Sequence, residues 1–147
     1  MIQSANKSHL NEILDIEKIV FTKPWTREQL KNDLVLSTNS ENWVYMEDQQ
    51  VVGYILGWKV MYEFHLNNIA VHFDFQRRHI GRSLIKHVKN RLQSQNIQRI
   101  YLEVSWKNKP TQKLYESMGF QKKSLRRDYY AIEEHGFLYH LNLVDND

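Results

Sequence analysis

The sequence contains no cysteine, only two prolines and five glycines, and no long apolar run. Without cysteine the chain cannot form disulfides or bind metal through sulfur, and a covalent acyl-cysteine mechanism is excluded. No segment approaches the roughly 20 consecutive apolar residues that a membrane-spanning helix needs. The N-terminal segment also lacks the layout of a signal peptide. We therefore expect a cytoplasmic protein with no membrane partner.

The residues that are present suffice for one folded unit. The chain has 147 residues, of which 41% are hydrophobic and 12% aromatic, so we expect a single domain over residues 1–147. The formal net charge is only +3, although the isoelectric point is about 9.0. Such a weak basic excess can steer an anionic ligand. Because no dense Arg/Lys block occurs, we expect no direct binding of nucleic acid as the main function.

Hydrophobic periodicity and turn residues predict, in order, two helices, three strands, a helix, a strand, a helix and two strands. Ser8 can cap the first helix, Thr26 and Gln29 form a capping box for the second, and Gly119 is suited to follow the last. The expected fold is α/β (α+β), with a mixed central sheet of about six to seven strands flanked by about four helices. The predicted strands are 43–46, 51–60, 64–71, 99–105, 120–124 and 137–143, with a further short strand at 2–4.

The segment DFQRRHIGR, from Asp74 to Arg82, lies between a predicted strand and a predicted helix. Backbone N–H groups at a helix N-terminus point outward, and both the helix dipole and arginine side chains favour phosphate oxygens. The segment therefore suits a phosphate-containing ligand. Taken alone, it is equally well explained as a solvated basic loop.

The wider segment NNIAVHFDFQRRHIGRSLIKHV resembles the acetyl-coenzyme A signature of the GNAT superfamily of N-acetyltransferases. In that signature a strand is followed by Gln/Arg-x-x-Gly-x-Gly/Ala and then a helix. Gln76, Arg77 and Gly81 match, whereas His79 stands where the first glycine is expected. A non-glycine residue at this point must adopt a positive φ, which histidine tolerates better than most residues.

A second stretch, LEVSWKNKPTQKLYESMGF, resembles the other signature of the superfamily through Asn108, Tyr115, Gly119 and Phe120. The two signatures occur in the expected order, so we expect acetyl-coenzyme A (acetyl-CoA) as a cosubstrate. In this family the last residues of the signature strand offer backbone groups to the pantetheine arm. The resemblance implies that acetyl-CoA is bound by Ile69, Ala70, Val71, Arg77, Arg78, His79, Ile80, Gly81, Arg82 and Asn108.

Further pieces, including the Pro24–Trp25 pair and the LRRDYY stretch from Leu125, resemble the RimI-type members of the superfamily. These enzymes acetylate the N-terminal alanine of small-subunit ribosomal protein eighteen. The resemblance implies a protein or peptide N-terminus as the acceptor, with a ribosomal protein as the expected partner. It also implies that Trp25, Tyr129 and Tyr130 form the walls of the acceptor site. Residues 131–137 depart most from the pattern of that group.

Glu103 is the candidate general base. It is the only acid in the apolar strand segment 100–104, and strand alternation puts it on one face with Tyr101 and Ser105. An amine must lose a proton before it can attack a thioester, and burial can raise the pKa of a carboxyl group toward a useful value. In RimI-type enzymes the matching glutamate accepts this proton. The alternative from the residues alone is a surface-facing strand position.

Tyr115 is the candidate general acid. A phenol has a pKa near 10, close enough to that of a thiol to protonate the leaving thiolate. The resemblance implies that its helix brings the hydroxyl beside the sulfur of the cofactor. The alternative is a core aromatic that packs with Leu114 and Phe120.

Several alternatives stay open at this stage. The acceptor could be a lysine side chain, a polyamine or another small amine, or the chain could be a non-catalytic acyl-CoA-binding module. The basic isoelectric point also leaves an RNA-associated interaction protein as a third possibility. The seven histidines are scattered and none has zinc-like spacing, so we expect no metal. We expect a monomer or a weak homodimer.

Overall fold

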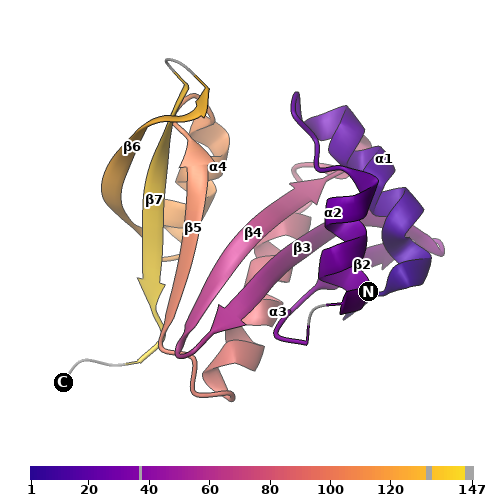
Figure 1. Cartoon of the computed structure of the whole chain (residues 1–147), viewed down its shortest axis with the longest axis horizontal. Coiled ribbons are helices and arrows are strands. Elements are labelled where there is room, and N and C mark those ends of the chain that lie inside the picture. The colour runs from indigo at the N-terminus through magenta and orange to yellow at the C-terminus, as the bar shows by residue number, and fades with distance from the viewer. Residues whose placement is uncertain (37, 132–133, 145–147) are drawn as a thin grey trace.

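The computed structural model of the chain describes residues 1–36, 38–131 and 134–144; the side chains of 35–36, 126–131 and 134 are not described. Its strands form one seven-stranded mixed sheet in the order β1-β2-β3-β4-β5-β7-β6, which confirms the predicted fold class (Figure 1). No described helix is long and apolar enough to span a membrane. The strands are β1 (Ile2–Ser4), β2 (Trp43–Glu47), β3 (Gln50–Val60), β4 (Glu63–Val71), β5 (Arg99–Ser105), β6 (Gln121–Ala131) and β7 (Glu134–Asn142).

Helices cover both faces of this sheet. The apolar sides of α1 and α2 pack on one face of β3 and β4, α3 packs on the other face of these strands, and α4 lies behind β5 (Figure 1). The central strand β3 is accordingly buried along its middle on both sides, as covered strands are. The helices are α1 (Leu10–Val20), α2 (Arg27–Lys31), α3 (Ile80–Gln93) and α4 (Lys109–Ser117), with short 3₁₀ turns at Lys7–His9 and Phe73–Phe75 and a π-turn at Asn32–Leu36.

The helix ends test the predicted caps. The Thr26–Gln29 capping box forms as predicted, and Gly119 follows α4 with a φ of 94°, which glycine adopts without strain. The prediction for Ser8 was wrong. Asn6 caps a 3₁₀ turn there, because its Oδ1 accepts from the N–H of Ser8 at 2.9 Å, and α1 starts only at Leu10. The closing strands are also longer than predicted, since β6 extends to Ala131.

Strands β4 and β5 separate in the middle of the sheet. Their parallel pairing has three steps and ends at His65 with Tyr101. On its other side, β4 stays paired with β3, but the register shifts so that Asn67 has no partner in β3. Such a bulge bends the strand that carries it. Beyond His65, β4 therefore leaves β5, and the two strands diverge toward the carboxyl end of β4 (Figure 1).

Candidate functional site

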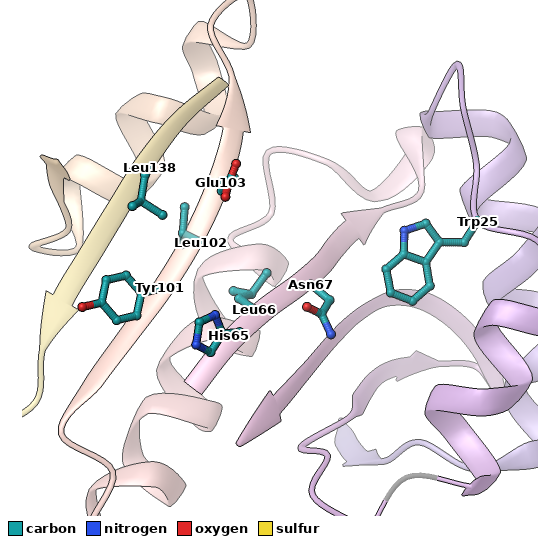
Figure 2. A pocket seen from close by; sticks show the side chains of 8 residues that line it. All are labelled: Trp25, His65, Leu66, Asn67, Tyr101, Leu102, Glu103 and Leu138. Atoms are coloured by element: carbon teal, nitrogen blue, oxygen red, sulfur yellow. The ribbon is translucent and has the colours of Figure 1, made fainter. Parts of the chain in front are cut away.

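A pocket of about 350 Å³ lies where β4 and β5 separate. Glu103 stands on β5 at one side of it, and Trp25 faces it from the loop after α1 (Figure 2). Ligands bind commonly where neighbouring parallel strands part, because backbone groups there lack strand partners. The residues that line the pocket are Trp25, His65, Leu66, Asn67, Tyr101, Leu102, Glu103 and Leu138.

Glu103 occupies the predicted face of β5. Tyr101, Glu103 and Ser105 are half-buried, and the intervening residues are buried in the core, so the alternation is confirmed. Glu103 pairs in register with Leu138 of β7, which also lines the pocket. The residue therefore faces a cavity and is not an open surface position. Its action as a base stays a prediction.

Beside Glu103, the rings of Tyr101 and His65 line the pocket (Figure 2). The ring of Tyr101 stacks on His65 with a centroid separation of 5.6 Å and on His140 with one of 6.3 Å. Burial, Lys123 and Arg99 lower the pKa of His140. His65 and Asn67 were not predicted as site residues, because they acquire this position only through the strand separation.

Tyr115 approaches from the other face of the sheet. Its side chain is 2% exposed and packs on Phe120 and Tyr139, with ring centroids 5.5 and 6.2 Å away. Tyr139 pairs in register with Leu102, whose side chain alternates with that of Glu103. The two predicted proton carriers thus belong to opposite faces of β5. The packing matches the core-aromatic alternative, and the role as an acid stays a prediction.

The loop before α3 has the backbone geometry of an anion site. His79 has a φ of 60° and Arg77 one of 65°, both in the left-handed region. The first helical hydrogen bond runs from the N–H of Ser83 to the carbonyl of His79 at 3.0 Å. Within the described part of the chain, nothing accepts from the N–H groups of residues 80–82. These groups and the helix dipole favour a phosphate here.

The side chains of this loop contribute unequally. The guanidinium of Arg78 binds Glu47 at 2.5 Å, and Arg82 donates to the hydroxyl of Ser117 at 2.8 Å. Arg77 is exposed. The side chain of Ile80 is 4% exposed and lies in the core, so Ile80 can offer a ligand only its backbone. The predicted arginine cluster is therefore partly engaged within the protein.

The end of β4 presents backbone groups to the open side. The N–H of His72 donates to the carbonyl of Val52 in β3 at 2.8 Å. Because alternate residues of a strand point their backbone groups to the same side, those of Ala70 also face β3, and those of Ile69 and Val71 face β5. The side-chain amide of Gln76 donates to the carbonyl of Val71 at 3.0 Å. This edge is where the predicted pantetheine contacts would form.

The remaining predicted residues have mixed outcomes. Asn108 caps α4, since its Oδ1 accepts from the N–H of Thr111 at 3.3 Å, and its predicted contact with the cofactor stays a prediction. Trp25 lines the pocket, and its predicted contact with the acceptor stays a prediction. Tyr129 and Tyr130 belong to β6, but their side chains lie outside the described residues. No group of three residues that could hold a metal occurs in the part of the chain that the structure describes.

A buried carboxylate that holds the backbone of Trp25 was not predicted from the sequence. Glu17 of α1 has no exposed surface. Its Oε1 accepts from the hydroxyl of Tyr54 and the side-chain amide of Asn68, and its Oε2 accepts from the N–H of Trp25 at 3.0 Å. Burial raises the pKa of Glu17, and the bonds from Tyr54 and Trp25 counteract this in part. The available signal was its place in the apolar stripe of α1, three residues after Leu14.

Known proteins resemble this chain in sequence and in fold. The acetyltransferase (GNAT) family model matches residues 10–120. A ribosomal protein bS18-alanine N-acetyltransferase of Haemophilus ducreyi is 28% identical over 134 residues, which cover 91% of this chain and 91% of that protein. The crystal structure of the ribosomal-protein-S18-alanine N-acetyltransferase from Escherichia coli covers 100% of this chain and 96% of its own, with a TM-score of 0.93 and 26% identity. Arabidopsis thaliana NAA60 in complex with acetyl-CoA has a TM-score of 0.85 over 97% of each chain at 16% identity, which shows the shared fold alone.

Proposed function

We propose that this chain, which belongs to the acetyltransferase (GNAT) family, transfers the acetyl group of acetyl-CoA to the N-terminal α-amine of a protein. The proposed acceptor is the N-terminal alanine of small-subunit ribosomal protein eighteen, in the cytoplasm. The observation that carries the proposal is the pocket at the β4–β5 separation, with Glu103 on its wall. The similarity to bS18-alanine N-acetyltransferases over nearly the whole chain supports the choice of acceptor.

The residues present fit the donor. The pyrophosphate of acetyl-CoA would bind the N–H groups at the start of α3, with Arg77 and the backbone of His79, Ile80 and Gly81 around it. The backbone of Ile69 and Val71 would pair with the pantetheine amides along the open edge of β4. Arg78 contributes little charge to this site, because Glu47 already holds and neutralises its guanidinium.

Glu103 would act on the acceptor amine. An α-amine has a pKa near 8, so at pH 7 only about a tenth of it is neutral and ready to attack. Glu103 on the pocket wall would accept the excess proton, directly or through a water molecule. Nitrogen then attacks the thioester carbonyl and loses its extra proton to solvent, and the carbon–sulfur bond breaks. Tyr115 would protonate the departing thiolate and regain a proton from solvent.

The test is thiol release from acetyl-CoA with a short peptide that carries the first residues of bS18 and a free N-terminal alanine. The matched control is the same peptide with a blocked N-terminus and an internal lysine. Turnover on the free alanine peptide alone supports the proposal. Turnover on the blocked peptide alone would show that the acceptor is a lysine side chain and not an N-terminal amine. Binding of acetyl-CoA without turnover on either peptide would favour a non-catalytic binding module.

A further inference from the structure

The burial of the Glu17 carboxylate costs folding free energy, and apolar packing alone does not explain why a glutamate occupies this position. It lies in the apolar stripe of α1 with no exposed surface, one turn after Ile13 and Leu14, which fill the core. None of the ion pairs among the described residues includes Glu17. Burying a carboxylate without a cation is expensive unless hydrogen bonds satisfy its oxygens. A leucine at this position would fill the stripe without that cost.

The hydrogen bonds of Glu17 join three separate segments. Oε2 holds the backbone of Trp25, which lines the pocket from the loop after α1. Oε1 holds Tyr54 of β3 and Asn68 of β4. Asn68 directly follows the bulge at Asn67, and its Oδ1 accepts from the N–H of Ile69 at 3.1 Å. One carboxylate therefore ties the Trp25 wall to the part of β4 that leaves β5.

We infer that Glu17 is a positioning residue for the acceptor: it fixes the distance between the Trp25 wall and the open edge of β4, and so sets the width of the pocket. The inference rests on the proposed function, because it assumes that the acceptor enters between these two walls. Glu17 acts through Trp25 and Asn68 and does not touch the reacting atoms. Losing this anchor weakens acceptor binding and leaves the donor site at the start of α3 in place.

Three variants test this, with KM for the alanine peptide, KM for acetyl-CoA and kcat measured for each. Glu17→Leu keeps the volume and removes the acceptor of the Trp25 N–H. We expect the peptide KM to rise about tenfold or more, as expected for loss of a hydrogen bond to a charged group. Glu17→Gln keeps a side-chain oxygen that can accept from the N–H of Trp25, but this oxygen carries no charge. Because a neutral hydrogen bond is weaker than a charged one, we expect the peptide KM of this variant to rise about threefold. Tyr54→Phe removes a different donor to Glu17. Because the bonds of Glu17 to Trp25 and Asn68 remain, we expect the peptide KM of this variant to be unchanged. In all three the KM for acetyl-CoA changes less than the peptide KM, because the N–H groups at the start of α3 that would bind the pyrophosphate have no contact with Glu17.

Turnover of the alanine peptide by the wild type distinguishes a failure of the proposed function from a failure of the inference about Glu17. If the wild type does not use the peptide, the proposed function fails. If the wild type does use the peptide, the peptide KM values of the three variants decide the role of Glu17. An unchanged peptide KM in Glu17→Gln overturns the inference, whether or not the leucine variant folds. A parallel rise of both KM values also overturns it, because a general loss of structure affects the donor site equally.

Discussion

The strongest stability prediction concerns Glu41, which precedes β2. The residue is 5% exposed and accepts hydrogen bonds from Arg91 at 3.0 Å, Gln95 at 3.0 Å and Trp43 at 2.8 Å. Burial alone would raise the pKa of Glu41, but the bonds from Arg91, Gln95 and Trp43 outweigh it and lower the pKa to about 2. Because Arg91 belongs to α3, this cluster fastens the helix whose first turn forms the proposed donor site.

The size of the effect follows from the two pKa values. The step from the ordinary value of 4.5 to about 2 corresponds to about 3 kcal/mol of folding free energy at neutral pH. The folded-state pKa is the lower one, so this stability is fully present above the unfolded pKa of 4.5 and is lost as the pH falls toward 2. At pH 3 less than half of it, about 1.4 kcal/mol, should remain.

The assay is urea unfolding of the wild type and Glu41→Gln between pH 7 and pH 3. We expect the variant to be less stable by about 3 kcal/mol at pH 7, with a gap that narrows by half or more at pH 3. Glu47→Gln is the matched control, because Glu47 forms an ion pair with the exposed Arg78. That pair should contribute less than about 1 kcal/mol. A gap for Glu41→Gln that stays constant with pH would refute the reasoning.

Three further variants test the site. Glu103→Gln should lower kcat/KM by about a hundredfold at neutral pH and by less at high pH, where the amine loses its proton unaided; an unchanged pH–rate profile would sink the base assignment. Tyr115→Phe should lower kcat about tenfold or more with little change in KM, and full activity would mean that the ring only packs. His79→Gly should keep or tighten acetyl-CoA binding measured by calorimetry, because glycine relieves about 1 kcal/mol of left-handed strain; a large loss of affinity would show that the imidazole itself binds.

Local signals in the sequence predicted most of the elements. The capping box at Thr26, the proline in the first turn of α4 and the glycine after it each act over a few residues, so their outcome needs no tertiary information. The left-handed backbone at His79 was likewise expected from the motif. By contrast, the bulge at Asn67 was not predicted, although the apolar alternation of β4 changes phase there, from Phe64 and Leu66 to Ile69 and Val71. A change of phase alone does not show which residue lacks a partner, because that depends on the register between β3 and β4.

The strand separation also explains how Glu103 and Tyr115 could serve one reaction. Alternation along β5 puts Glu103 on one face, and the packing of Tyr115 on Tyr139 puts it on the other. In a continuous sheet two such residues have the backbone between them and cannot reach the same ligand. Pairing between β4 and β5 ends at His65 with Tyr101, before the level of Glu103, so the sheet is open at that level. In the proposed mechanism the base and the acid therefore approach one acetyl group from opposite faces through this opening. The reaction would then depend on the bulge that keeps β4 away from β5.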